Sequence, residues 1–213
     1  MTRIIALTGP AGSGKDLTAE IMMAQMLKRN FGVKIHQLSF AEPIKKAVAS
    51  ILGCSVDLLD DREFKEGSLT DSHDLDVSPR EMMQLLGDDF ARQMIDQKIW
   101  IKTAQHKFDL FCDKKADYVF ITDLRYENEH KWVLENGGVV IYVDRQNAEP
   151  INNHASEAGL SRPPCFVLDN NSCIDSLKTG INALCTLVQP STHQRNSIDD
   201  CTPAEWDSIR GMY

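Results

Sequence analysis

The sequence lacks three features: a CxxC pair, an internal repeat, and an apolar run long enough to span a membrane. Its six cysteines are scattered, at positions 54, 112, 165, 173, 185 and 201. This spacing argues against a structural zinc site and predicts reduced, mostly buried thiols of a cytoplasmic protein. A strand pattern starts directly after the N-terminus, so we expect no signal peptide.

Positive charge is also scarce. Lys and Arg number 23 against 31 Asp and Glu, which gives a formal net charge of -8. This balance argues against a long nucleic-acid partner, so a local group of Lys and Arg must hold any phosphate ligand. The length of 213 residues and the 42% hydrophobic content fit one α/β domain with an insertion or a tail.

The most informative stretch is GPAGSGKD, residues 9–16, which follows the apolar run 4–7 and opens a helical pattern. Strand, glycine-rich turn, Lys and helix are the layout of a phosphate-binding P-loop. Backbone N–H groups and the helix N-terminus would cradle an anion, and Lys15 would reach the outer phosphates. Asp16 stands where Ser or Thr usually supplies a hydroxyl to magnesium. The alternative is an ordinary glycine-rich strand-to-helix turn.

Strand and helix patterns alternate along most of the chain, which predicts an α/β fold with a parallel sheet and helices on both faces. The predicted strands are 3–8, 33–39, 118–123, 139–143 and 166–168. The predicted helices are 15–29, 43–52, 98–111, one after Asp123, and 173–187. Residues 55–115 form a largely helical insertion. Residues 54–76 are a polar, acidic loop region. After it, Ser78 and Glu81 form a capping box that opens a helix at Pro79.

Charged residues gather where the predicted strands end. In open parallel sheets, ligands bind outside the carboxyl ends of the strands. The residues at or just past these ends are Lys15, Phe40, Asp123, Arg125 and Arg145. Asp123 is the candidate acidic residue beside magnesium, although it could instead cap a helix. Asp16 could bind magnesium directly or through water, or simply favour the helix N-terminus.

Arginines decide what else binds, because phosphoryl transfer needs cations around the moving group and around an anionic acceptor. Each arginine could instead form a surface salt bridge. We expect functional roles for Arg80 and Arg125.

A series of motifs in this order carries a family resemblance: GPAGSGKD, SFAEPIKK, DDREFKE, SPREMMQLLGDDFAR, Trp100, ITDLRYENE and NHASE. Together they resemble the deoxynucleoside monophosphate kinases of tailed bacteriophages, over about residues 3 to 188. The resemblance implies a nucleoside monophosphate kinase-like P-loop fold with a five-stranded parallel sheet. It implies a core of 1–54 and 116–188, a monophosphate-binding insertion at 55–115, a lid loop at 145–163 and a tail at 189–213.

The resemblance also implies site residues. The ATP-binding set is Gly9, Ala11, Gly12, Ser13, Gly14, Lys15, Asp16 and Leu17. The substrate-binding set is Phe40, Lys65, Arg80, Gln84, Arg92 and Arg125. The catalytic set is Lys15, Asp123, Arg125 and Arg145, with Asp16 and Asp123 as magnesium ligands. The segment 154–157 would lie in the lid. Asp88-Asp89 departs from the Thr-Glu expected after SPREMMQLLG.

The implied activity is transfer of phosphate from ATP to a deoxynucleoside monophosphate (dNMP), for DNA precursor synthesis in a host cytoplasm, with Mg²⁺ and in a homodimer. The acceptor phosphate is already ionised, so no general base is needed. One alternative is a kinase of another small metabolite, such as a coenzyme precursor or phosphomevalonate, where a hydroxyl acceptor would make Asp123 a general base. Another is a nucleotide-binding regulator without turnover.

Overall fold

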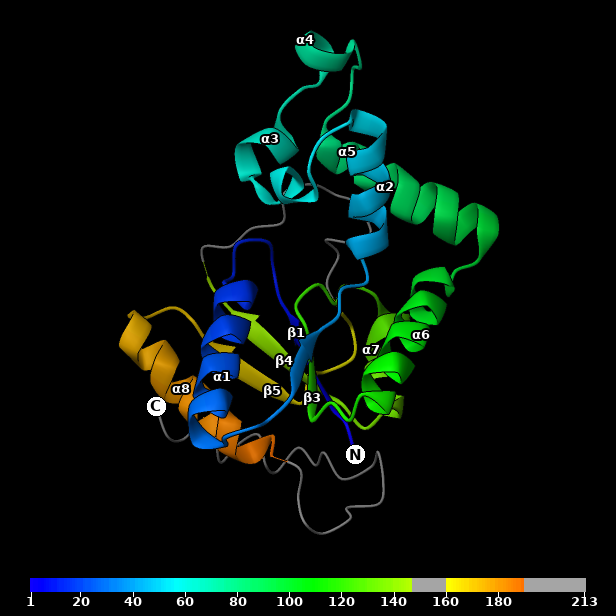
Figure 1. Ribbon diagram of the computed structural model, residues 1–213. Helices are drawn as coiled ribbons and strands as arrows, with labels where there is room; N and C mark the ends of the chain where they lie inside the picture. Colours follow the sequence, from blue (N-terminus) through cyan, green and yellow to red (C-terminus); the bar gives the residue numbers. More distant parts are fainter. Residues whose placement is uncertain (147–159, 190–213) are drawn as a thin grey trace. The chain divides into compact units, whose positions relative to one another are not determined.

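The computed structural model describes residues 1–146 and 160–189 (Figure 1). The chain divides into two compact units. The first contains residues 1–38 and the described residues from 106 onward, and the second contains 39–105. Most of the predicted lid loop, at 147–159, and most of the predicted tail, at 190–213, lie outside the described residues. The division of the core and insertion at 55 and 115 stays a prediction, since compactness does not show which residues bind a monophosphate.

The first unit is built on a sheet of five parallel strands in the order β2-β3-β1-β4-β5. The strands are β1 (Arg3–Thr8), β2 (Ile35–Gln37), β3 (Tyr118–Ile121), β4 (Val139–Asp144) and β5 (Phe166–Asp169). The central strand β1 pairs with β3 on one side and β4 on the other. The α/β fold with a five-stranded parallel sheet is therefore confirmed.

Helices cover both faces of this sheet. They are α1 (Lys15–Arg29), α7 (Glu127–Glu135) and α8 (Ile174–Leu187), with the C-terminal part of α6 (Ile99–Asp113). Figure 1 shows α1 and α8 side by side on one face and α7 on the other. The alternation along β1 explains this arrangement. Ile5 and Leu7 join the core with α1 and α8, whereas Ile4 and Val133 of α7 both lie next to Gly138, and all four side chains are fully buried.

The second unit is helical. Its elements are α2 (Glu42–Leu52), η1 (Val56–Asp60), α3 (Arg62–Glu66), α4 (Thr70–His73), α5 (Pro79–Gln84), η2 (Leu85–Ile95) and the start of α6. The prediction of a loop region at 54–76 is wrong, because three short helices occupy it. Leu59 and Leu69 are buried against Val48 of α2, and Asp61 caps α3 by accepting a hydrogen bond from the Phe64 N–H.

The predicted capping box is confirmed: the Ser78 hydroxyl accepts from the Glu81 N–H, and the Glu81 carboxylate accepts from the Ser78 N–H. The helix that this box opens continues from α5 into η2, an 11-residue π-helix. Trp100 donates its indole N–H to the carbonyl of Gly87 in this π-helix at 2.8 Å.

The sequence predicted mostly buried thiols and showed no apolar run long enough to span a membrane. The five cysteines in the described residues are free, but of these only Cys185 is buried, so the prediction of mostly buried thiols is wrong. No helix in the described ranges has the length and apolar character that crossing a membrane requires.

Candidate active site

The glycine-rich loop joins β1 to α1 at the carboxyl edge of the sheet. Gly9, Gly12 and Gly14 all have positive φ angles, of 139°, 75° and 92°. A Cβ on Gly9 would lie 2.6 Å from the Val143 carbonyl oxygen, so this position also needs glycine for space. The loop thus adopts a backbone that these glycines permit and other residues would strain.

The Lys15 side chain folds back over the loop that precedes it. Its Nζ donates to the carbonyl oxygens of Gly9 at 2.9 Å and Pro10 at 2.7 Å. The ammonium therefore lies over the loop itself, where a bound phosphate could replace these carbonyl contacts.

Two side chains from outside the loop hold further carbonyls. Arg145 Nη1 donates to Gly12 at 3.4 Å, and Asn170 Nδ2 donates to Ser13 at 2.8 Å. Within the loop itself, the Ser13 N–H donates to the Pro10 carbonyl at 3.2 Å, so the loop backbone is held from both sides. Arg145, predicted as catalytic, is thereby brought to the P-loop.

The start of α1 adds a helix dipole to this loop. Gly14 is its N-cap and offers no side chain, and Asp16 lies exposed in the first turn. The hydroxyls of Ser13 and Thr18 are buried and, within the described part of the chain, have no hydrogen-bond partner. Since Thr18 is buried, Asp16 is the exposed oxygen-bearing side chain in this turn, and its role toward a metal stays a prediction.

The loop after β3 carries Asp123 and Arg125 beside the P-loop. Thr8, the last residue of β1, donates its buried hydroxyl to the Leu124 carbonyl at 3.0 Å. The carboxylate of Glu129 accepts from the Arg125 N–H at 2.9 Å and the Tyr126 N–H at 3.1 Å. These bonds fix the backbone that presents the two predicted catalytic side chains.

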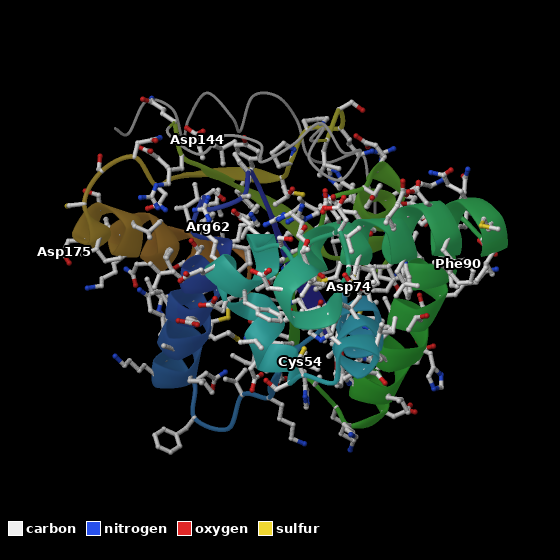
Figure 2. All side chains as sticks on the ribbon, turned by 90° about the horizontal axis from the view of Figure 1, so that it is seen from above. Cys54, Arg62, Asp74, Phe90, Asp144 and Asp175 are labelled. Atoms are coloured by element: carbon white, nitrogen blue, oxygen red, sulfur yellow. The ribbon has the colours of Figure 1, made fainter. Side chains whose placement is uncertain are left out.

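Hydrogen bonds join the ends of β4 and β5 next to the P-loop. Asn171 Nδ2 donates to Asp144 Oδ2 at 3.1 Å, and its Oδ1 accepts from the Gln146 N–H at 2.6 Å. Figure 2 labels Asp144. The carboxyl edge of the first unit therefore brings together the predicted residues of the P-loop, Asp123, Arg125 and Arg145.

The remaining predicted substrate residues belong to the second unit. Arg80 Nη2 donates to Glu66 Oε1 at 3.3 Å, and its side chain is 14% exposed. Arg92 donates to the Gln97 carbonyl at 3.4 Å and lies 4.0 Å from Asp88 Oδ1.

The other three members of this set differ in exposure. Phe40 is buried, whereas Lys65 and Gln84 are half-buried. Their roles toward a substrate, like those of the P-loop residues, stay predictions.

Part of the predicted site lies outside the described residues. This part is 147–159 of the lid loop, which includes the segment 154–157. Among residues 1–146 and 160–189, no group of three or more His, Cys, Asp or Glu could hold a metal ion.

Two titratable groups on α7 have shifted pKa values. A hydrogen bond from the Ser161 hydroxyl, at 2.7 Å, is the main cause that lowers the pKa of Glu127. The same carboxylate accepts from the Arg162 N–H at 3.1 Å, which fixes 161–162 to the start of α7. Burial lowers the pKa of His130.

Sequence reasoning missed Thr8, Glu129 and Asn170 as parts of the site. The rule that ligands bind at strand ends, applied to β1 and β5, would have pointed to Thr8 and Asn170. The role of Glu129 depends on how the loop after β3 folds back, for which its motif alone gives no geometry.

The described geometry is that of a P-loop protein: a glycine-rich loop and Lys between the central parallel strand and its helix, with an acidic residue after the neighbouring strand. The family model for deoxynucleotide monophosphate kinase matches residues 59–181, more than half of the chain. The chain belongs to this family, and the resemblance seen in its motifs is confirmed.

Several viral proteins are similar to the chain. A mimivirus protein (Acanthamoeba polyphaga mimivirus), provisionally assigned as a deoxynucleotide monophosphate kinase, is 26% identical over 84% of this chain and 93% of its own. The deoxynucleoside-5'-monophosphate kinase of Escherichia phage T5 is 23% identical over 75% and 86%. The deoxynucleotide monophosphate kinase of Enterobacteria phage T4 is 31% identical over 47% and 42%.

Solved structures are more distant. The APS kinase CysC of Mycobacterium tuberculosis, in complex with AMPPNP and APS, is 13% identical over 86% of this chain and 96% of its own, with a TM-score of 0.45.

Proposed function

We propose that the chain transfers the γ-phosphoryl group of ATP to a dNMP, with ADP and a deoxynucleoside diphosphate as products. The observation that carries this proposal is the meeting of the P-loop with the Asp123–Arg125 loop, which the Thr8–Leu124 hydrogen bond links. A donor loop with carboxylate and guanidinium groups beside it suits transfer between two anionic nucleotides.

The donor half of the site would be the P-loop. Lys15 exchanges its carbonyl partners, Gly9 and Pro10, for phosphate oxygens of ATP. The dipole of α1 adds positive potential at the same place. Arg145, already on the Gly12 carbonyl, lies at this loop and can spread the charge of the moving phosphoryl group.

The acceptor half would use cations of the second unit. Arg80, Lys65 and Arg92 are the proposed phosphate ligands, and Gln84 the proposed contact to the base edge. Phe40 would support the acceptor only through packing, since its side chain is buried. Arginine suits this role because its planar fork binds phosphate oxygens in pairs.

The reaction needs no general base. An ionised phosphate oxygen of the dNMP forms a bond to the γ-phosphorus while the bond to the β–γ bridging oxygen breaks, and ADP leaves with that electron pair. No proton is abstracted, so catalysis consists of positioning, charge neutralisation and exclusion of water. Asp123 therefore acts as a metal ligand in this proposal.

Magnesium fits the groups present. It prefers hard oxygen ligands, typically one or two carboxylates together with phosphates and waters. Asp16, exposed in the first turn of α1, and Asp123, partly exposed after β3, are the carboxylates that would hold it. When bound, Mg²⁺ neutralises charge on the β- and γ-phosphates.

An acceptor panel tests the proposal. Wild-type protein and Lys15→Ala are incubated with ATP, Mg²⁺ and, in turn, dGMP, dTMP, dAMP, dCMP, a modified dCMP and small hydroxyl metabolites. We expect ADP and deoxynucleoside diphosphate in equal amounts from the wild type, and a loss of at least a hundredfold in Lys15→Ala. Phosphorylation of the metabolites alone would support the other kinase class, and ATP binding without acceptor-dependent ADP release would support a regulator.

Three further expectations accompany this function and need their own measurements. A homodimer is checked by light scattering of the full chain, a host-cytoplasmic location by fractionation of infected cells, and the absence of nucleic-acid binding by a filter-binding assay at low salt.

A further inference from the structure

Asn170, the first residue after β5, reaches across to the P-loop. Its Nδ2 donates to the Ser13 carbonyl at 2.8 Å. A Cβ built on Gly14 would lie 2.7 Å from the same nitrogen, so the amide lies directly against the N-cap of α1. No P-loop pattern in the sequence includes this residue, which is 157 positions away from Ser13.

The backbone that carries Asn170 is held firmly. Its own N–H donates to the Asp144 carbonyl at 2.9 Å. The next residue, Asn171, binds the carboxylates of Asp144 and Asp169 through its Nδ2, at 3.1 Å and 2.6 Å. The amide that meets the P-loop therefore projects from two joined strand ends and has little freedom to follow the loop if the loop moves.

The bond controls a peptide that can turn over easily. The Ser13–Gly14 peptide unit is followed by a glycine with a φ of 92°, and glycine adopts either sign of φ at little cost. If this unit flipped, the Ser13 carbonyl oxygen would replace the Gly14 N–H on the side where an anion binds. An oxygen there would repel phosphate, whereas an N–H attracts it.

We propose that Asn170 is a positioning residue of the ATP site, which keeps the Ser13–Gly14 peptide oriented with its N–H toward the phosphates. This inference rests on the proposed function only in taking ATP as the ligand. Asn170 does not touch the reacting atoms in this proposal, since it acts on the far side of the peptide, through the Ser13 carbonyl.

The test compares three variants of the full chain by calorimetric titration with ATP and Mg²⁺. Asn170→Ala removes the donor. Asn170→Asp keeps the shape of the side chain but cannot donate. Asn136→Ala is the matched control, because Asn136 Nδ2 donates to the Trp132 carbonyl at 2.9 Å, in the same unit but at the end of α7.

The expected results separate positioning from stability. Losing one hydrogen bond that favours the binding geometry lowers ATP affinity about five- to tenfold in Asn170→Ala. Asn170→Asp loses more ATP affinity, about thirtyfold, because its charge repels the triphosphate. The melting temperature of each variant is measured as well, so that a loss of ATP affinity is not confused with a loss of folded protein. Asn136→Ala binds ATP as the wild type does.

Three outcomes would overturn the inference: ATP affinity of Asn170→Ala within twofold of the wild type, an equal loss in Asn136→Ala, or a wild type that does not bind ATP. Because the readout is binding, a wild type that binds ATP but phosphorylates no dNMP would refute the proposed function alone. If Asn170→Ala does not fold, Asn170→Leu decides, because it removes the donor, keeps a side chain of similar size and adds no charge.

Discussion

The hydroxyl of Thr8 donates a buried hydrogen bond, 3.0 Å long, to the carbonyl oxygen of Leu124. Thr8 ends the central strand and Gly9 follows it, while Leu124 separates Asp123 from Arg125. One hydrogen bond thus joins the end of β1, from which the P-loop starts, to the loop that carries Asp123 and Arg125. The relative placement of these two loops depends on a residue that no phosphate would touch.

Replacing Thr8 by Val keeps the shape of the side chain and leaves the Leu124 carbonyl buried without this donor. We expect the free energy of unfolding to fall by about 1–3 kcal/mol. We also expect kcat to fall severalfold with the KM for ATP unchanged, because the loop of Asp123 and Arg125 loses its alignment. Urea unfolding and steady-state kinetics measure the two effects.

The control for Thr8→Val is Thr179→Val on α8, where the hydroxyl donates to the Asp175 carbonyl at 2.9 Å on an exposed helix face. This variant should change the free energy of unfolding by less than about 0.5 kcal/mol and leave kcat at the wild-type value. Wild-type kcat in Thr8→Val would refute the alignment role.

Arg80 and Arg62 offer a matched pair, because both lie 3.3 Å from the same oxygen, Glu66 Oε1. They differ in exposure: the Arg80 side chain is 14% exposed and that of Arg62 is 80% exposed. We expect Arg80→Ala to raise the KM for dNMP about tenfold or more, since an enclosed guanidinium is the better phosphate ligand.

Arg62→Ala should leave the KM for dNMP within twofold, because exposed ion pairs contribute little. Figure 2 labels this residue. Steady-state titration of dNMP at saturating ATP measures both variants. Equal effects of the two substitutions would mean that only the ion pairs with Glu66 matter, and an effect of Arg80→Ala on the KM for ATP alone would place Arg80 in the donor half.

Glu129 holds the turn that presents Arg125, since its Oε2 accepts the N–H groups of Arg125 and Tyr126. We expect Glu129→Ala to lower the free energy of unfolding by about 1.5–3 kcal/mol, as buried N–H groups lose a charged acceptor. We expect kcat to fall together with it. Glu129→Gln, which keeps an acceptor oxygen, should restore part of both quantities.

The control is Glu135→Ala on the same helix, where the carboxylate makes an exposed i,i+4 ion pair with Lys131. Glu135→Ala should leave the free energy of unfolding and kcat nearly unchanged. If Glu129→Gln were as impaired as Glu129→Ala, the charge rather than the hydrogen bonds to the turn would matter.

The sequence predicted those parts of the fold whose signals are local. The P-loop follows from glycine and Lys spacing, the sheet from apolar runs, and the start of α5 from Ser78 and Glu81. The short helices between 54 and 76 were missed because they depend on burial of Leu59 and Leu69, two isolated apolar residues without helical periodicity. The π-helix η2 was missed for a related reason, since its period differs from that of the α-helix.

For the candidate site too, the sequence predicted some residues and missed others. Charged side chains at strand ends could be predicted, since their chemistry is visible in the sequence. Thr8, Glu129 and Asn170 act by holding backbone carbonyls and N–H groups of distant loops. Such partners depend on which loops meet, and for Asn170 the partner is 157 positions away.

The last prediction concerns pH, through His130 on α7. Its ring is fully buried, and among the described residues neither ring nitrogen has a hydrogen-bond partner. Burial is the main cause that lowers its pKa below the ordinary value of about 6.5, while the nearby Glu127 opposes the shift and Arg162 adds to it.

A histidine with a lowered pKa in the folded state takes up a proton more readily when the chain is unfolded. The free energy of unfolding should therefore fall as pH drops below about 6.5, and level off only below the folded pKa. Urea unfolding between about pH 7.5 and pH 5.5 measures this slope. In His130→Leu the slope should flatten, whereas His106→Leu, at an exposed position of α6, should keep the wild-type slope. A wild-type slope in His130→Leu would assign the acid sensitivity to other groups.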